Sequence, residues 1–484
     1  MKVFNRGEKP SALVSLIPFI ALIIALSLVI KVFGADALAG GSQVALMLSA
    51  GVAVAIAMIF YRIPWKNLED SIVDNVSSVA TSIVILLLIG AVSGSWMVSG
   101  VVPTMIYYGM KVITPSIFLF ASCAICALVS IMTGSSWTTI ATIGVALVGI
   151  GTAQGYEPGW IAGAIISGAY FGDKVSPLSD TTVLASSSAG TPLFTHIRYM
   201  MVTTVPSFII SLIIFLIVSL MHKNPDTAMV QGFSEDLAAK FNISPWLLLV
   251  PVLTGLLIAK KVPAIITLFS AAVFAGIFAL IAQPHLISEI AGVPYESDLS
   301  LMDGYKGLFQ TYYGSTSLNT GNPELDSLIS TRGMTGMLNT VFLIIAASTF
   351  GGVLVGSGML QSLTDSLVHF VHRRVTMVAS TVGTGIFANM ITGDQYLSIL
   401  LTSSLYKKLY KDRGYESKLL SRSVEDSATV VSVLVPWNSC GMTQATVLKI
   451  PTLDYLPYCF FNLISPLMSI FIAAIGYKIV RKSK

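Results

Sequence analysis

Carboxylates beside helix-breaking residues are the part of this sequence best suited to chemistry. In GDKVSPLSDTT, residues 172–182, Asp173 and Asp180 flank Pro177, which removes an amide donor and interrupts the helical hydrogen bonds. The break frees backbone carbonyls next to four hydroxyl side chains: Ser176, Ser179, Thr181 and Thr182. Because oxygen ligands suit a hard cation such as sodium, we expect Asp173 and Asp180 to be sodium ligands. A structural alternative pairs Asp173 with Lys174 or with a basic residue at the membrane edge.

A second segment near the C-terminus repeats this pattern with different chemistry. VEDSATVVSVLVPWNSCG, residues 424–441, places Pro436 as the counterpart of Pro177. Asn438 and Ser439 then match Ser179 and Asp180, so a carboxylate in one copy is a hydroxyl in the other. The remaining candidate ion or substrate ligands of this segment are Glu425, Asp426, Asn438 and Ser439. For the two acids, a salt bridge to Arg422 is the structural alternative.

Two Thr-Gly turns supply the rest of the candidate site. They lie in MTGSSWTT, residues 132–139, and ITGDQYLS, residues 391–398. Glycine permits backbone conformations that expose amide and carbonyl groups to a ligand, and helix N-termini favour anions and orient water. We expect the polar residues after each glycine to bind ion or substrate, with Asp394 as a third sodium ligand: Ser135, Ser136, Thr138, Asp394 and Gln395.

Composition indicates that membrane-spanning helices position these residues. Of 484 residues, 54% are hydrophobic and 11% are charged, and the mean hydropathy is +0.80. Soluble domains carry about 25% charged residues, so a soluble fold is excluded. The net charge of +4 is spread over short basic runs, which argues against a nucleic-acid partner. The sequence has no phosphate-binding loop, zinc-protease motif or nucleophile elbow. We therefore expect that the protein is not an enzyme, that it binds no cofactor, and that an ion gradient drives transport.

The apolar runs predict an all-α polytopic membrane protein. Fourteen begin near residues 12, 43, 76, 116, 133, 158, 200, 244, 262, 336, 376, 394, 416 and 452. A full passage needs about 20 apolar residues, so the shorter runs could be re-entrant hairpins, and we expect about 11 to 14 passages. The distribution of Lys and Arg predicts that both termini are cytoplasmic and that residues 283–332 form the largest external loop.

An internal repeat relates the two halves of the chain. At an offset of 259 residues, nine of sixty positions from 133 to 192 are identical without a gap, including Gly155-Tyr156-Glu157 on Gly414-Tyr415-Glu416. Only the second copy of this tripeptide is flanked by basic residues, so we expect the copies to face opposite sides of the membrane. This predicts an inverted-repeat transporter with a site near the midplane. A duplication kept for packing alone is the alternative.

The repeat sets the expected organisation of the chain. N-terminal helices occupy residues 1–75, and the first inverted repeat spans 76–222. Connecting helices and the external loop span 223–335, and the second inverted repeat spans 336–484.

The central motifs also resemble a known family. FGDKVSPLSDTTVLASSSAGTPLFTHIRYM, residues 171–200, is similar to the signature of NhaC-type sodium/proton antiporters. Residues 424–441, followed by PTLDYLPYCFFN at 451–462, resemble the C-terminal pattern of that family. The resemblance covers most of the chain. It implies a bacterial inner-membrane protein with sodium and protons as coupled ions and a fold of inverted repeats with hairpins.

Sodium/proton exchange is therefore the expected function. The family also includes malate/lactate sodium antiporters and relatives that carry amino acids, so a sodium-coupled exchanger of organic anions or amino acids is the alternative. Lys174 is the only basic residue in the central motifs, which disfavours an organic anion because such a ligand usually needs an Arg fork or two positive groups. The expected partners are sodium, protons and the lipid bilayer, with a small organic anion in the alternative, and we expect a homodimer.

Overall fold

The computed structural model describes most of the chain as helices. The described residues are 9–33, 40–222, 227–260, 262–294, 299–321, 323–368 and 373–479. Within them no strand forms, and one isolated antiparallel bridge joins Thr316 to Thr331. The predicted all-α fold is therefore confirmed. Residues 1–8 and 480–484 lie outside the described part, so the expected position of the two chain ends stays a prediction.

Among the described residues before position 222 there are twelve α-helices, and short π-helical segments interrupt or extend them. The N-terminal group comprises α1 (Ala12–Ser15), α2 (Ile17–Phe33), α3 (Gly41–Ala55), α4 (Trp65–Ser78), α5 (Ala80–Val98) and α6 (Val101–Val112). The next group comprises α7 (Phe118–Thr133), α8 (Ser136–Thr139), α9 (Val145–Ala153), α10 (Pro158–Val175), α11 (Asp180–Ala189) and α12 (Leu193–Met221). The π-helical segments here are η2 (Ile56–Phe60) and η4 (Ile140–Gly144).

The second half of the chain has a connecting group and a C-terminal group. The connecting helices are α13 (Thr227–Lys240), α14 (Leu249–Ala259), α15 (Ala264–Ala282), α16 (Pro284–Ala291), α17 (Leu301–Tyr313) and α18 (Pro323–Ile329). The C-terminal helices are α19 (Leu338–Gly356), α20 (Met359–Val368), α21 (Arg374–Thr392), α22 (Gln395–Asp412), α23 (Ser417–Val424), α24 (Ser439–Leu448), α25 (Thr452–Tyr455) and α26 (Phe460–Ile475). Glu425–Thr429 form the π-helical η7, and Ser432–Leu434 form the 3-10 helix η8.

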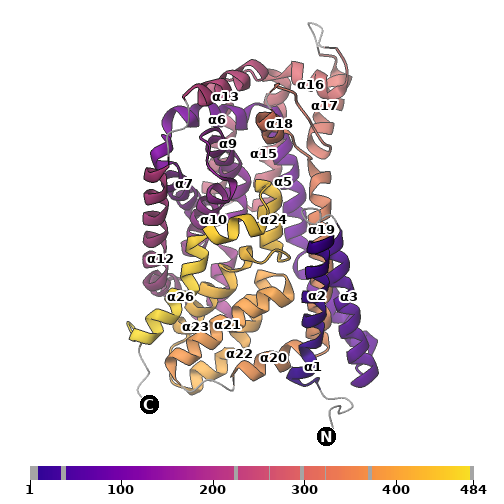
Figure 1. Ribbon diagram of the computed structural model, residues 1–484, viewed down its shortest axis with the longest axis vertical. Helices are drawn as coiled ribbons and strands as arrows, with labels where there is room; N and C mark the ends of the chain where they lie inside the picture. The colour runs from indigo at the N-terminus through magenta and orange to yellow at the C-terminus, as the bar shows by residue number, and fades with distance from the viewer. Residues whose placement is uncertain are drawn as a thin grey trace.

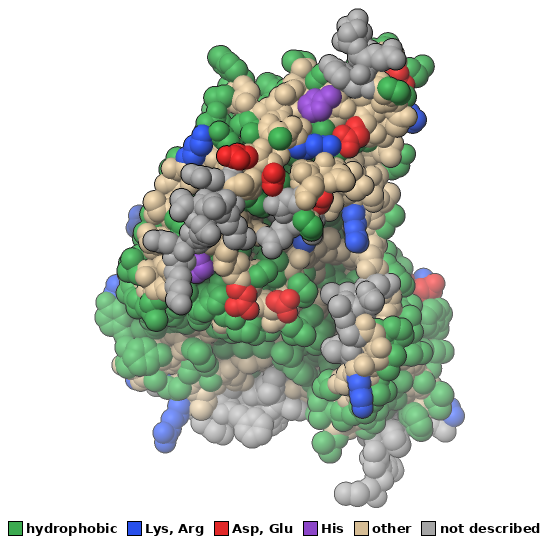
Figure 2. Space-filling view, turned by 45° about the horizontal axis from the view of Figure 1, so that its top comes forward, with side chains coloured by type: hydrophobic (Ala, Val, Ile, Leu, Met, Phe, Trp, Pro, Cys, Tyr) green, Lys and Arg blue, Asp and Glu red, His purple; other side chains and the backbone are tan. Residues whose placement is uncertain are grey.

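Length and composition identify nine helical segments of the described residues that could cross a membrane, or eleven if two bent helix pairs are each one span. The bends are 85° between residues 232–240 and 245–257, and 55° between 452–458 and 460–475. Large apolar side chains on these helices face outward, for example Leu28, Ile213 and Phe269, each about half exposed. Figure 2 shows these green flanks, with acidic and basic side chains gathered on the end turned toward the viewer.

The two Gly-Tyr-Glu turns lie at opposite ends of α12. This helix has 29 residues, which corresponds to about 43 Å. Beyond its C-terminus, the His222 ring stacks on Tyr156 at 3.8 Å. Just before its N-terminus, the carbonyl of Gly190 accepts a hydrogen bond from Ser417 Oγ at 3.1 Å. The two copies of the tripeptide are therefore separated by a membrane-length helix.

The two ends of the molecule are built from different groups of helices. Figure 1 shows α1, α20, α22 and α23 at one end and α13, α16, α17 and α18 at the other. The segment predicted as the largest loop, residues 283–332, folds into α16, α17 and α18 at this second end. Which end faces the cytoplasm stays a prediction at this point.

Candidate functional site

Two helices end in the same way, one in each half of the chain. α7 stops at Thr133 and α21 at Thr392, and the glycines that follow, Gly134 and Gly393, have φ angles of 66° and 63°. Residues with a side chain rarely adopt this left-handed conformation. The space is also closed, since a Cβ on Gly134 would lie 2.7 Å from the carbonyl carbon of Leu178. Glycine is therefore needed for the chain to turn at these points.

The residue after each glycine caps the next helix with its side chain. Ser135 Oγ accepts a hydrogen bond from the Thr138 amide at 3.2 Å, and Asp394 Oδ1 accepts one from the Leu397 amide at 2.9 Å. Both the caps and the donors are 259 residues apart in the sequence. Ser135 and Asp394 thus have the same structural role, although only Asp394 carries an acid.

Proline interrupts the chain at the matching place in each half. Pro177 separates α10 from α11, and Pro436 separates η8 from α24. α11 and α24 each contain ten residues and are capped by Ser179 and Asn438, whose side chains accept hydrogen bonds from backbone amides of those helices. The predicted broken helices are confirmed at both prolines.

A cavity of about 410 Å³ lies where the two breaks of the first half meet the start of α22. Its polar wall consists of carboxylate, hydroxyl and amide side chains, contributed by Thr133, Ser135, Thr138, Asp173, Asp180, Thr181, Gln395 and Tyr396. The facing wall comes from the first turns of α5 and α15, with Thr81, Ile85, Val262, Pro263, Ala264, Ile265 and Thr267. None of the described residues that line the cavity is basic.

Asp173 and Asp180 reach this cavity from the two sides of the Pro177 break. Asp173 is buried, and its Oδ2 accepts hydrogen bonds from Ser136 Oγ at 2.7 Å and from the Ser136 amide at 3.2 Å. Asp180 is exposed and is the first residue of α11. The ammonium of Lys174 turns away to Asp426, so the alternative pairing of Asp173 with Lys174 does not occur here.

Several predicted ligands of the first motif brace the break instead of lining the cavity. Ser176 Oγ donates to the carbonyl of Ile131 at 2.8 Å, and Thr182 Oγ1 donates to the carbonyl of Lys174 at 3.0 Å. Ser179 Oγ lies 2.9 Å from Thr181 Oγ1. Of these hydroxyl residues, Thr181 is the one that also lines the cavity.

In the second half, only one of the predicted ligands lines the cavity. Gln395 does so, and its Oε1 accepts a hydrogen bond from Ser432 Oγ at 3.3 Å. Asp394 is fully buried, and its Oδ2 accepts a hydrogen bond from Ser439 Oγ at 3.4 Å. The Asn438 side chain donates to α21. Asp394 and Ser439 therefore join the start of α22 to α24 beside the cavity, and Asn438 joins α24 to α21.

Charged side chains from both halves form a second buried group, which we call the Lys174 cluster: Lys174, Arg422, Glu425 and Asp426. Lys174 Nζ is paired with Asp426 Oδ1, which also accepts hydrogen bonds from hydroxyls of Thr203 at 3.1 Å and Ser465 at 3.2 Å. Arg422 Nε lies 3.8 Å from Asp426 Oδ2. The alternative salt bridge of Asp426 to Arg422 is thus present, but the closer partner of Asp426 is Lys174.

Glu425 is the unpaired acid of this cluster. Its side chain is fully buried, and neither of its oxygens has a hydrogen-bond partner in the described part of the chain. The Thr429 hydroxyl interacts with it electrostatically without meeting hydrogen-bond geometry. Arg422 also lacks hydrogen bonds, because its three guanidinium nitrogens are buried without a hydrogen-bond partner among the described residues.

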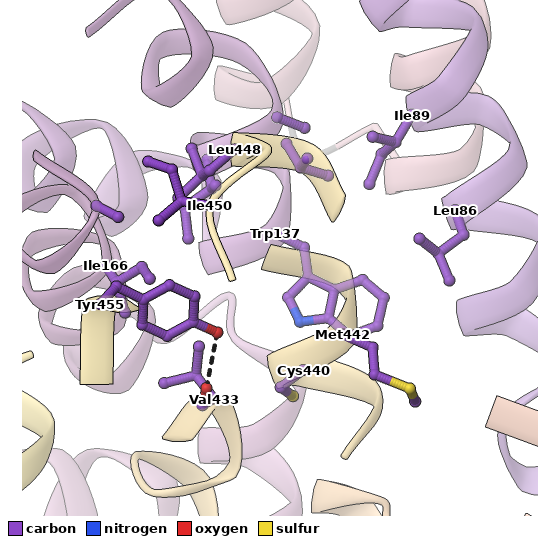
Figure 3. Close-up of a cluster of buried hydrophobic side chains, with 14 of the residues drawn as sticks. Leu86, Ile89, Trp137, Ile166, Val433, Cys440, Met442, Leu448, Ile450 and Tyr455 are labelled. Carbon is purple, nitrogen blue, oxygen red and sulfur yellow. Dashed lines mark hydrogen bonds between the residues drawn. The ribbon is translucent and has the colours of Figure 1, made fainter. Parts of the chain in front are cut away.

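A cluster of buried hydrophobic side chains packs against Trp137 in the wall of the cavity (Figure 3). Trp137 lines the cavity and lies beside Cys440 and Met442 of α24 (Figure 3). Tyr455 OH donates to the carbonyl of Val433 at 2.9 Å, which ties α25 to the segment before Pro436 (Figure 3). These contacts join α8 to α24 and α25 to η8, on both sides of the Pro436 break (Figure 3).

Sequence reasoning missed two parts of this arrangement. The wall from α5 and α15 lies outside the repeated motifs, and its first turns look like those of any apolar span. The pairing of Lys174 with Asp426 was also missed, although a lysine inside an apolar segment is itself a signal that an acidic partner lies nearby. Within the described residues, no group of three or more His, Cys, Asp or Glu side chains could hold a metal ion.

Comparison with known proteins places the chain in a family. The family model described as "Na+/H+ antiporter family" matches residues 6–190 and 168–477. The chain is 36% identical over 423 residues to the Na(+)/H(+) antiporter NhaC of Bacillus subtilis, covering 87% of this chain and 90% of that protein. It is 37% identical over 428 residues to NhaC of Alkalihalophilus pseudofirmus, covering 88% and 89%.

The chain belongs to the Na+/H+ antiporter family. The resemblance predicted from residues 171–200 is confirmed, and together with the nine or more apolar helices it identifies a multi-pass membrane protein. The chain also matches a relative named for other substrates. It is 33% identical over 425 residues to the malate-2H(+)/Na(+)-lactate antiporter of Bacillus subtilis, and the match covers 87% of this chain and 87% of that protein.

Proposed function

We propose that this chain exchanges sodium for protons across the bacterial inner membrane. The observation that carries the proposal is the cavity beside the Pro177 break, where Asp173 and Asp180 face hydroxyl and amide oxygens. Sodium prefers such oxygen ligands, and buried carboxylates are groups that can carry the exchanged proton. The names of two curated relatives, both sodium/proton antiporters, support the same activity.

The exchange of an organic anion is less well supported. A malate or lactate ion would bring its own negative charge next to Asp173 and Asp180, and no described lining residue is basic. Moving a carboxylate out of water without a cationic partner costs several kcal/mol. The cavity chemistry therefore favours a cation as the bound species.

We also propose the sidedness of the transporter. The two Gly-Tyr-Glu turns lie at opposite ends of α12, which supports an inverted repeat with residues 155–157 external and 414–416 cytoplasmic. The cavity is lined by the N-terminal turns of α5 and α15. Just beyond the C-termini of these two helices, Gln283 Nε2 donates a hydrogen bond to the Ser99 carbonyl at 3.5 Å, so the C-terminal ends lie together away from the cavity. With α16–α18 external, this conformation has its cavity in the cytoplasmic half.

Transport by purified protein in liposomes tests the proposal. With an outward sodium gradient and no organic solute, an internal pH dye should report acidification, because protons enter as sodium leaves. Asp173→Asn keeps the volume but removes the charge, so we expect at least a hundredfold lower rate with normal folding. The matched control is Asp303→Asn, which changes a partly exposed acid of α17 that does not line the cavity. A pH signal that appears only after malate, lactate or an amino acid is added would replace the proposal by the alternative.

A further inference from the structure

Glu425 is buried in a way that sets it apart from the other buried acids. Asp173 accepts hydrogen bonds from Ser136, Asp394 accepts one from the Leu397 amide, and Asp426 is paired with Lys174. Neither oxygen of Glu425 has such a partner in the described part of the chain. A buried, unpaired carboxylate costs far more free energy than the neutral acid. The arrangement around Glu425 thus fits a carboxyl group that holds its proton in this conformation.

The surroundings of Glu425 provide a charge partner for the other protonation state. Arg422 lies one turn before it, fully buried, with no hydrogen bond to its guanidinium nitrogens from the described residues. The guanidinium packs against the Tyr199 ring at 4.8 Å. Lys174 is the second nearby cation and interacts electrostatically with Glu425. After Glu425 releases its proton, these two cations would stabilise the remaining carboxylate.

The Lys174 cluster is also connected to the cavity. Asp173 and Lys174 are consecutive residues of α10, yet Asp173 lines the cavity and Lys174 joins the cluster. Asp173 interacts electrostatically with Glu425. A sodium ion at Asp173 would cancel that negative charge and so favour loss of the proton from Glu425. Sodium binding and proton release are then linked with the sign that an antiporter needs.

We propose that Glu425 carries the exchanged proton, at a site separate from the sodium site at Asp173 and Asp180. The proposal rests on sodium/proton exchange as the function. In each cycle the Glu425 carboxyl gives up one proton to the aqueous phase as sodium binds in the cavity, and it takes up a proton on the other side of the membrane after sodium leaves. Sodium and proton thus occupy different carboxylates instead of competing for the same oxygens.

Other ionisable groups near Glu425 must be considered in any pH dependence. Asp173 and Lys174 of α10 and the neighbouring Asp426 interact electrostatically with Glu425 itself. His196 and Tyr199 of α12 and Tyr410 of α22 interact in the same way with other members of the Lys174 cluster, which are Lys174, Asp426 and Arg422 of α23. α11 contributes only Asp180, which lines the cavity. α26 has no ionisable residue, and α21 has only Arg374 at its first position, where it donates to the carbonyl of Ala474.

Two sodium fluxes in proteoliposomes separate the two sites. Wild-type protein should show ²²Na⁺ uptake driven by a pH gradient and also ²²Na⁺/Na⁺ exchange at equal pH. Glu425→Gln mimics the protonated acid, which by the same linkage weakens sodium binding, so both fluxes are measured at saturating sodium. We expect pH-driven uptake to fall at least tenfold while sodium exchange stays within about twofold. Glu157→Gln, in an exposed acid, is the matched control and should change neither flux. Asp173→Asn should lose both.

The pH dependence of sodium affinity gives an independent readout. One linked proton changes the apparent sodium affinity by up to about tenfold per pH unit. This slope should be present in wild-type protein and absent in Glu425→Gln. A slope that persists in the variant, or pH-driven uptake at the wild-type rate, overturns the proposal. Loss of both fluxes in a folded Glu425→Gln protein also overturns it, because Glu425 would then belong to the sodium site.

A folding defect does not prevent a decision. If Glu425→Gln cannot be recovered folded, Glu425→Asp keeps a carboxyl and should retain pH-driven uptake with a displaced pH midpoint. Retained uptake with an unchanged midpoint contradicts the proposal. Failure of the proposed function itself has a different signature, since wild-type protein would then show no sodium-dependent proton movement at all.

Discussion

The two halves of the chain use one backbone plan for different chemistry. In the first half, Ser136 donates to Asp173, and 259 residues later Gln395 accepts from Ser432. The positions correspond, but the carboxylate of one pair is a hydroxyl in the other. The halves thus share their hydrogen-bonding frame and differ in which positions carry charge.

The difference is larger at the Lys174 cluster. The residues that correspond to Arg422, Glu425 and Asp426 in the first half are Gly163, Ile166 and Ser167. Gly163 packs closely on Tyr458, and Ser167 accepts a hydrogen bond from the Phe461 amide. The second half therefore contributes three charged residues to the Lys174 cluster, whereas the corresponding positions of the first half make close packing and hydrogen-bond contacts. Matching positions of the two halves therefore need not carry the same chemistry.

Cysteine labelling tests most directly whether the two halves have opposite orientations in the membrane. Glu157 and Arg413 are exposed beside the two tripeptide turns, whereas the four native cysteines are buried. If the halves are inverted, an impermeant maleimide added outside cells should modify Glu157→Cys and spare Arg413→Cys. Equal labelling of both variants would show that the two halves do not have opposite orientations.

Removing the cation that joins the halves should cause the largest loss of stability. Lys174→Met leaves Asp426 buried without its ammonium partner, which should cost about 3 to 5 kcal/mol. Thermal unfolding in detergent measures the loss. Adding Asp426→Asn to Lys174→Met removes the unpaired charge and should recover part of the stability. Wild-type stability of the single variant would show that the pair adds nothing.

Exchanging the two caps separates structure from ion chemistry. Asp394→Ser gives the second half the capping residue of the first half, where Ser135 caps the equivalent helix. We expect a loss of stability below about 1 kcal/mol, because Ser and Asp are similar as caps. Transport should nevertheless fall about tenfold if Asp394 takes part in ion binding. Unchanged transport would leave Asp394 with the capping role alone.

The smallest effect is expected where the short helices α11 and α24 end. Gly190 follows α11 with φ of 77°, and Lys449 follows α24 with φ of 58°. Gly190→Ala should lower stability by about 1 kcal/mol, because a side chain disfavours this conformation. The added Cβ would meet only Lys407 at an ordinary 3.5 Å, so the cost is in the backbone. An unfolding temperature equal to wild type would mean that the turn relaxes.

Local signals explain which parts of the fold could be predicted. The helix ends at Gly134 and Gly393 and the breaks at Pro177 and Pro436 follow from single residues and their conformational limits. Asp173 and Asp180, expected as ligands on the two sides of the Pro177 break, both line the cavity.

Long-range contacts explain what could not be predicted. Ser176 and Thr182 were expected to be ligands, but they donate to backbone carbonyls, and only the three-dimensional path of the chain decides between these roles. The Lys174–Asp426 pair spans 252 residues, and nothing near either residue specifies its partner. The wall from α5 and α15 depends on tertiary packing in the same way.

The Lys174–Asp426 pair has a consequence for how the protein is made. A ribosome adds about 5 to 20 residues per second, so roughly 13 to 50 s pass between synthesis of Lys174 and of Asp426, 252 residues later. During this time the lysine is in the membrane without its acid, at a cost of about 2.5 to 3.5 kcal/mol on insertion scales. The first half is thus an unfinished assembly until the second half arrives, and a ribosome that stalls between the two leaves a fragment suited to recognition by membrane quality-control proteases.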